Sequence, residues 1–216
     1  MKRETAMYRF FPGKKDEFIS LVSGAEAYIQ RACARLGAKN ASAWSVNEFL
    51  YLYAEFEDGD PHGLKQLTDE FAGDMSACVQ EIAAPGSMRL MYHDIGNVRA
   101  DKSLIRRRVF ATVLKDGCAE EYKARHQKLI DARGERVSDG PETNFTIRCA
   151  CDRYIFGYCE LVKSYDHEPS AEEKAATIAW ETRQLEIMDW LTDDVDWITG
   201  ERHEKMKNLF IQDGYR

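Results

Sequence analysis

Two stretches of the chain share the pattern that decides its fold: SAWSVNEFLYLYAEFEDGD (residues 42–60) and NFTIRCACDRYIFGYCELV (residues 144–162). Each consists of two runs of aromatic and aliphatic residues about a short polar turn, Asn-Glu in the first and Asp152-Arg153 in the second. This pattern predicts a β-hairpin. The tripeptide YAE (53–55) matches YCE (158–160), and Asn40 matches Asn144. The two hairpins therefore read as copies of one repeated unit.

The segments around each hairpin follow the same order. The first half predicts a strand, a helix, two strands, a helix and a strand, over residues 5–11, 14–36, 39–46, 49–57, 62–83 and 88–94. The second half predicts the same series, with a strand at 109–114, a helix from Cys118, the hairpin, a helix at 170–191 and a strand at 208–213. This is the ferredoxin-like arrangement. We predict an α+β protein with ferredoxin-like domains at 1–97 and 105–216, joined by a linker at 98–104.

The aromatic strands also suggest how the two domains meet. A ferredoxin-like sheet carries helices on one face and leaves the other to be covered. The run FLYLYAEF (49–56) suits burial on both faces better than contact with water. We therefore expect the two sheets to pack together as an intrachain dimeric α/β barrel, in which the chain is an internal pseudo-dimer.

Composition narrows the class of protein. The net charge of −7 and pI near 5.4 argue against nucleic-acid and anionic-membrane partners, which require a basic surface. The N-terminus MKRETAMYRFF lacks the apolar core of a signal peptide, and no run of eighteen apolar residues could span a membrane. The six cysteines show no framework spacing, although Cys149 and Cys151 would share one face of a strand. We predict a cytoplasmic protein with reduced, mostly buried thiols and neither metal nor other cofactor.

The repeat also allows the first helices of the two halves to be aligned position by position. Phe18 lies 22 residues before Asn40, and Tyr122 lies 22 before Asn144. With that offset Leu21 aligns with Arg125 and Val22 with His126. Arg and His at inward positions are costly unless they are paired, which favours a polar cavity. The alternative is that the second helix is rotated and turns these side chains to water.

The stretch VFATVLKDGCAEEYKARH (109–126), followed by NFTI (144–147) and IFGYCE (155–160), resembles the L-rhamnose mutarotase family. The resemblance covers most of residues 106–213, and the first half looks like a diverged copy without the Tyr/His pair. It implies cofactor-free interconversion of sugar anomers on small ferredoxin-like chains. It also implies that His126 is the proton donor and that Tyr122 contacts the substrate.

The second half departs from the family pattern at two places. A hairpin tyrosine of the family is Phe145 here, and the family's tryptophan pair falls near Gln184 and Leu185. We expect His126 and Tyr122 to be catalytic. The expected substrate-binding residues are Arg125, Asn144, Phe145 and Trp190.

These observations predict an aldose mutarotase that acts on L-rhamnose or a related deoxy sugar by His-mediated ring opening. A histidine that titrates near neutral pH can serve as both acid and base in this reaction. Two alternatives stay open: a non-catalytic sugar-binding or structural relative, and a cofactor-free oxygenase or haem-handling protein with the same barrel. The expected partner is a monosaccharide, and the expected assembly is a monomer or a homodimer.

Overall fold

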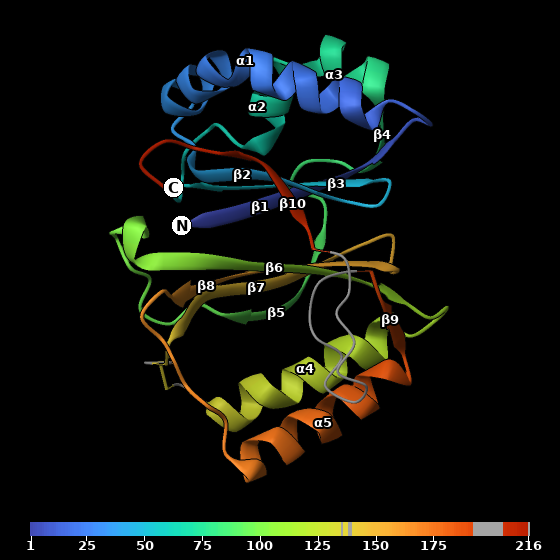
Figure 1. Cartoon of the computed structure of the whole chain (residues 1–216), viewed down its shortest axis with the longest axis vertical. Coiled ribbons are helices and arrows are strands. Elements are labelled where there is room, and N and C mark those ends of the chain that lie inside the picture. Colours follow the sequence, from blue (N-terminus) through green and yellow to red (C-terminus); the bar gives the residue numbers. More distant parts are fainter. Residues whose placement is uncertain (135, 138–139, 192–204, 216) are drawn as a thin grey trace. The chain divides into compact units, whose positions relative to one another are not determined.

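The computed structural model describes residues 1–134, 136–137, 140–191 and 205–215. Its strands form two five-stranded antiparallel sheets, each with helices over one face (Figure 1). The chain divides into two compact units, one made of Met1–Met88 with Met206–Arg216 and the other of Arg89–Lys205.

The first unit contains three helices and a sheet of order β10-β2-β3-β1-β4. The strands are β1 (Lys2–Phe10), β2 (Lys39–Val46), β3 (Phe49–Phe56), β4 (Val79–Ala83) and β10 (Lys207–Ile211). The helices are α1 (Lys15–Arg35), α2 (Leu64–Asp69) and α3 (Ala72–Cys78). The apolar stripe of α1, which includes Phe18, Val22 and Cys33, packs in the hydrophobic cluster on the helix-covered face of this sheet.

The second unit repeats the arrangement, with a sheet of order β5-β7-β8-β6-β9. Its strands are β5 (Arg89–Asp94), β6 (Ile105–Leu114), β7 (Glu142–Ala150), β8 (Tyr154–Val162) and β9 (Met188–Trp190). Its helices are α4 (Ala119–Arg133) and α5 (Ala171–Leu185), with a 3-10 helix at Lys102–Leu104. Without β10 and β5, each sheet has the strand order and connections of a ferredoxin-like domain. The predicted α+β class is confirmed, and the packing of the two sheets into one barrel stays a prediction.

The last strand of each half differs from the prediction. The expected helix at 62–83 ends at Cys78 and is followed by β4, and the expected helix at 170–191 ends at Leu185 and is followed by β9. These two short strands pair with β1 and β6. They were missed because a short apolar run has no period that separates a strand from the end of a helix.

Because β4 and β9 take the fourth position, the strands β5 and β10 join the other unit. β5 pairs with β7, and β10 pairs with β2. The predicted domain boundaries are therefore corrected: residues 89–97 belong to the second unit, and residues 206–216 belong to the first. The predicted linker at 98–104 contains the 3-10 helix, where Lys102 is buried and forms an ion pair with Glu160.

Each sheet holds one fully buried glutamate in the same setting. Glu55 Oε1 accepts hydrogen bonds from Asn40 Nδ2 and the Tyr53 hydroxyl, both at 2.8 Å. In the second unit, Glu160 Oε1 accepts from Asn144 Nδ2 at 3.0 Å and from the Tyr158 hydroxyl at 3.1 Å. Both asparagines have a left-handed backbone, with φ of 51° and 54°, a conformation that asparagine adopts more readily than most residues.

Four of the six cysteines are buried, namely Cys33, Cys78, Cys149 and Cys159, and all six are free thiols. The sequence suggested that Cys149 and Cys151 share one face of a strand. They do not, because Cys151 begins the turn after β7 with φ of 52°. In the part of the chain that the structure describes, no helix is long and apolar enough to cross a membrane.

Candidate functional site

The site predicted on α4 faces the interior of the second unit. Tyr122, Arg125 and His126 expose only 3%, 8% and 5% of their surface. Arg125 and His126 lie three and four residues after Tyr122, on the side of α4 that covers the sheet. The alternative of a rotated, water-facing helix is therefore wrong, and the inward stripe of α4 is polar where that of α1 is apolar.

The His126 ring is held in one orientation. Nδ1 lies 2.9 Å from the Tyr122 carbonyl oxygen, which can only accept, so Nδ1 carries the proton of the neutral ring. The ring centroid lies 4.3 Å from that of Tyr122, 5.5 Å from that of Tyr92 and 5.4 Å from that of Trp180. Burial lowers the pKa of His126 from its usual value, although the bond to the Tyr122 carbonyl opposes this change. At neutral pH the ring is a neutral base with its lone pair on Nε2.

Tyr122 belongs to the hydrophobic cluster that lies against β6, β7 and β8. Burial raises the pKa of its hydroxyl far above the usual value, and the charge of Glu181 acts in the same direction. The phenol therefore keeps its proton at any physiological pH. In catalysis Tyr122 can donate a hydrogen bond, but it cannot act as a base.

Helix α5 completes the layer over the sheet. It begins with a capping box, in which the Ser170 hydroxyl accepts from Glu173 N and the Glu173 carboxylate accepts from Ser170 N. The inward positions that follow at helical spacing are Trp180, Glu181 and Gln184, and Gln184 is 2% exposed. The facing sides of α4 and α5 are therefore both rich in polar groups, an arrangement that a purely structural core avoids.

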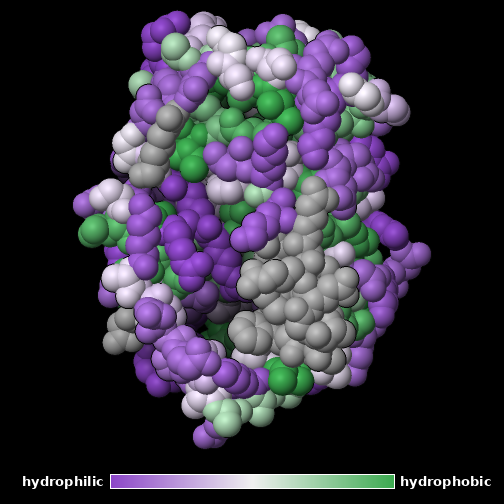
Figure 2. Space-filling model, in the orientation of Figure 1, coloured by the Kyte–Doolittle hydropathy of each residue, from purple (hydrophilic) through white to green (hydrophobic). Residues whose placement is uncertain are grey.

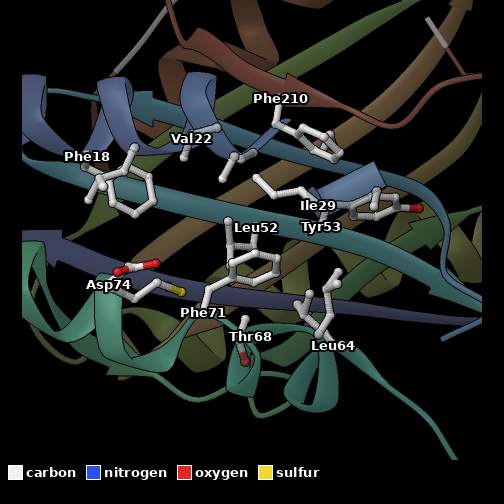
Figure 3. Close-up of a pocket in the computed structure, with 17 residues that line it drawn as sticks. Phe18, Val22, Ile29, Leu52, Tyr53, Leu64, Thr68, Phe71, Asp74 and Phe210 are labelled. Carbon is white, nitrogen blue, oxygen red and sulfur yellow. The ribbon is translucent and has the colours of Figure 1, made fainter. Parts of the chain in front are cut away.

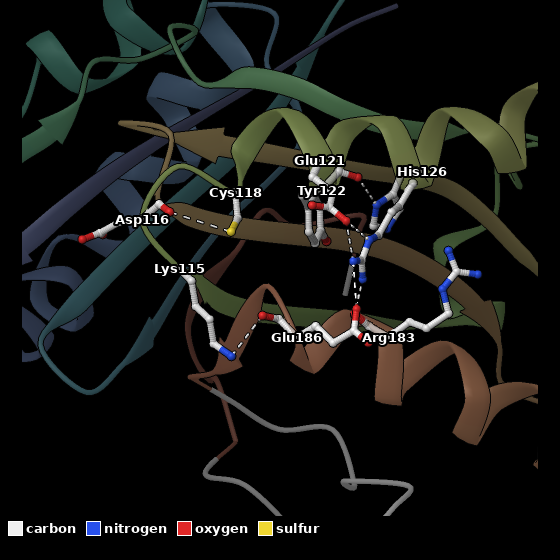
Figure 4. Close-up of polar contacts among 9 residues, drawn as sticks. Lys115, Asp116, Cys118, Glu121, Tyr122, His126, Arg183 and Glu186 are labelled. Atoms are coloured by element: carbon white, nitrogen blue, oxygen red, sulfur yellow. Dashed lines mark hydrogen bonds and ion pairs between the residues drawn. The ribbon is translucent and has the colours of Figure 1, made fainter.

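Arg125 ties the two helices together, because it bonds Glu121 on α4 and both Arg183 and Glu186 at the end of α5; these three partners are labelled in Figure 4. Its Nη2 donates to Glu121 Oε1 at 2.5 Å and to Glu186 Oε2 at 3.0 Å, and Nη1 donates to the Arg183 carbonyl. Lys115 Nζ donates to the carbonyl oxygens of Leu185 and Glu186. Both cations thus cap the carboxyl end of α5, where they also suit the helix dipole. This geometry favours a positioning role for Arg125 over the sugar contact predicted for it.

A row of aromatic rings extends from His126 across the sheet. Tyr92 lies between His126 and Phe145, with its centroid 5.2 Å from that of Phe145. Phe110 continues the row, at 6.3 Å from both Phe145 and Trp190. The Phe110 ring fits because position 157 is glycine: a Cβ there would lie 2.1 Å from the ring. The predicted residues Phe145 and Trp190 therefore share the His126 side of the sheet.

The Asn144 side chain bonds a carboxylate within the sheet and not a residue of this aromatic row. It is fully buried, and its amide donates to Glu160 Oε1. The first unit makes the same bond between Asn40 and Glu55, although it has no Tyr/His pair. Because the bond does not depend on the pair, the structure favours a role for Asn144 in the hairpin over the predicted sugar contact.

The corresponding region of the first unit is an apolar cavity of about 100 Å³. Phe18, Leu21, Val22 and Ile29 line it from α1, with Asp74 at one side (Figure 3). Hydrophobic atoms are visible between the helices of this unit (Figure 2). The positions that carry Tyr122, Arg125 and His126 in the second unit thus carry only hydrocarbon here, so no acid–base group stands at these positions.

The sequence analysis did not place Tyr92, Trp180 or Glu181 at the site, and it named Gln184 only as a position near which the family's tryptophan pair falls. The signal for α5 was present, since Trp180, Glu181 and Gln184 recur at the spacing of one helix face. No such signal exists for Tyr92, which lies on the last strand predicted for the first half but pairs in the second sheet. No cluster of His, Cys, Asp or Glu suited to a metal occurs among the described residues.

Comparison with known proteins agrees with this geometry. The model of the L-rhamnose mutarotase family matches residues 107–211. This segment of the chain resembles that family. The matched segment contains α4, the hairpin β7–β8, α5 and β9, and so includes His126 and every other residue predicted for the site. The match leaves out the first unit apart from β10, so the reading of residues 1–97 as a diverged mutarotase copy stays a prediction.

One solved structure resembles the chain as a whole. It is a candidate monooxygenase from Fusobacterium nucleatum subsp. nucleatum, 10% identical, with a TM-score of 0.50 over 97% of this chain and 94% of the other. At this identity the likeness concerns the fold alone. No curated protein matches the chain.

Proposed function

We propose that the protein is an aldose mutarotase that interconverts the α and β anomers of L-rhamnose or a related sugar, with His126 as the proton-transfer group. The observation that carries the proposal is the buried, oriented imidazole of His126 in a polar layer. Its Nε2 forms no hydrogen bond with the described residues, so this atom can meet a substrate. The family match over residues 107–211 supports a sugar as that substrate.

The reaction needs one proton to move between two oxygens of the sugar. Nε2 takes the proton of the anomeric hydroxyl, O1. A C1–O1 double bond forms, the C1–O5 bond breaks, and its electron pair goes to the ring oxygen. The imidazolium then gives the proton to O5. After the aldehyde rotates about C1–C2, the same steps run in reverse and close the ring on the opposite face.

One nitrogen can serve both oxygens because both are bonded to C1. The Tyr122 carbonyl stabilises the imidazolium that forms, since it accepts the Nδ1 proton in both charge states. The implied role of His126 as proton donor is thus preceded by a step in which it is the base. A positioned acid–base group of this kind contributes roughly 10²–10⁴-fold to a rate.

The test is proton exchange spectroscopy between the two anomers of L-rhamnose, L-fucose and other aldoses. The wild-type protein should accelerate exchange of at least one sugar, and His126→Ala should remove the gain by roughly 10²-fold or more. His62→Ala is the matched control, because His62 is a half-exposed residue of the first unit. An unchanged rate in His126→Ala would sink the proposal. Sugar binding without faster exchange would instead favour the non-catalytic relative.

A further inference from the structure

The first unit has a cavity of its own beneath its longest helix, with a volume of about 100 Å³. Apolar side chains line it from α1, from the sheet and from the segment between α2 and α3, among them Phe18, Val22, Ile29, Leu52 and Phe71 (Figure 3). Protein interiors leave few voids larger than a water molecule, because an empty void loses packing energy. An apolar ligand that filled this cavity would recover that energy.

The cavity reaches the surface of the unit. Two of the residues that line it are exposed, Leu21 of α1 at 38% and Asp74 of α3. Both lie where α1 passes over α3, so the opening is between these two helices. A small molecule can therefore enter without unfolding of the sheet.

The inner part of the cavity offers little to water. Apart from Asp74, its polar lining residues are Ser42, Tyr53 and Thr68, and their hydroxyls each have a hydrogen-bond partner within the unit, at 2.9, 2.8 and 2.9 Å. A buried water needs two or more polar partners, whereas a cavity of about 150 Å³ lined by Leu, Ile and Phe stays dry and can hold benzene. The inner part therefore suits an apolar group of that size.

The mouth of the cavity carries an unpaired negative charge. The segment from α2 to α3 has three carboxylates. Asp69 pairs with Lys65 at 2.7 Å, and Glu70 pairs with Arg35 at 2.6 Å. Asp74, which lines the cavity, forms no ion pair with the described residues, and none of the described lining residues is basic. The free carboxylate favours a cation at the mouth and repels an anion.

We propose that the first unit binds a small hydrophobic amine. Its apolar body, about the size of one benzene ring, fills the cavity, and its ammonium group pairs with Asp74. An acid of the same shape is repelled by that carboxylate, and a neutral molecule lacks the ion pair. The site includes no residue of the proposed mutarotase site, so either proposal can fail without the other.

The experiment measures the affinity of the full chain for three probes of one shape: 2-phenylethylamine, 2-phenylethanol and 3-phenylpropanoate. Titration NMR of methyl-labelled protein also locates the probe, because the methyl signals of Val22, Ile29 and Leu52 should shift. The amine should bind about 2–5-fold more tightly than the alcohol, the range of an exposed ion pair, and the carboxylate should bind more weakly than either. Salt at about 1 M should remove these differences.

Two substitutions separate the charge from the cavity. Asp74→Asn should bind the amine and the alcohol equally, whereas Asp16→Asn removes an exposed charge of α1 outside the cavity and should keep the preference. Ala25→Phe places a ring in the cavity and should abolish binding of all three probes. Ala27→Phe, on the exposed side of the same helix, should bind as the wild type does.

Three outcomes would overturn the proposal. One is that no probe shifts the cavity methyl signals at millimolar concentration, which together with a higher melting temperature of Ala25→Phe would show only imperfect packing. Another is that the wild type binds the alcohol or the carboxylate as tightly as the amine at low salt. The third is that Asp74→Asn keeps the preference for the amine.

Discussion

At the scale of single residues, the site depends on how the protein sets the charge of one imidazole. His126 lies among Tyr92, Tyr122 and Trp180, and the one hydrogen bond that it makes with the described residues goes to a backbone carbonyl. No carboxylate is needed to hold the tautomer, because the carbonyl one helical turn earlier does so. Burial keeps the ring neutral, which makes it ready to accept a proton at physiological pH.

This environment predicts the pH dependence of the reaction. In the proposed reaction the neutral ring is the active base, and its folded pKa is below the ordinary value of 6.5. The kcat/KM for anomer exchange should therefore fall only as the pH drops below 6.5, and should be flat between about pH 7 and 8. The measurement is exchange spectroscopy from pH 4.5 to 8.5. A midpoint above 6.5, or a rate that declines as pH rises through neutrality, would contradict the assignment.

At the scale of elements, two cations hold the carboxyl end of α5: Arg125 on α4, and Lys115 between β6 and α4. Arg125 donates to the Arg183 carbonyl near that end, and Lys115 donates to the carbonyl oxygens of Leu185 and Glu186. The tie helps to fix the position of Trp180 against His126. A helix of fifteen residues whose inward side is polar gains little from apolar burial, so this tie contributes much of its anchoring.

Replacing Arg125 tests the tie. Arg125→Met should lower the free energy of unfolding by about 1–3 kcal/mol, because the Arg183 carbonyl loses its donor while Glu121 and Glu186 remain more than half exposed to water. Anomer exchange should slow as well, through loss of the α5 position. Urea unfolding with and without Glu186→Gln measures the coupling between the two side chains.

Arg31→Met is the matched control, since Arg31 is an exposed arginine of α1. It should change stability by less than about 0.5 kcal/mol. Equal stabilities of the Arg125 and Arg31 variants would mean that the tie contributes nothing.

The same scale shows what the sequence could predict. Periodicity located α1, α4 and both hairpins because each is long and has a clear repeat. It missed β4 and β9, which have five and three residues and whose strand state depends on pairing with β1 and β6. The Tyr122/His126 pair was found through the internal repeat. The Arg125 ion pairs and the burial of Gln184 were not predictable, because both depend on the approach of α5 to α4.

At the scale of the whole molecule, the two units exchange their final strands. β5 completes the second sheet and β10 the first. β10 contributes Phe210 to the apolar cluster of the first unit, and Gln212 donates to the Ala38 carbonyl and accepts from Ala41 N. The first unit therefore depends on residues that follow the second unit in the sequence.

Removing residues 206–216 should destabilise the first unit selectively. Loss of Phe210 alone should cost about 3–5 kcal/mol, and β2 would become an unpaired edge. Hydrogen exchange followed by mass spectrometry should show lost protection in residues 39–46 and unchanged protection in residues 144–162, which contain the second hairpin. Equal loss in both hairpins, or no loss in either, would show that β10 does not stabilise the first unit in particular.

The exchange of β10 has a consequence for the order of events on the ribosome. Its pairing partner β2 is synthesised early, and 117 residues lie between Met88 and Met206. At typical rates of translation the N-terminal sheet waits on the order of 10 s with one strand missing. The nascent first unit is thus an incomplete domain with an open sheet edge, while the second unit has all its strands. Rapid synthesis of this protein would therefore favour the use of chaperones that act at the exit tunnel of the ribosome.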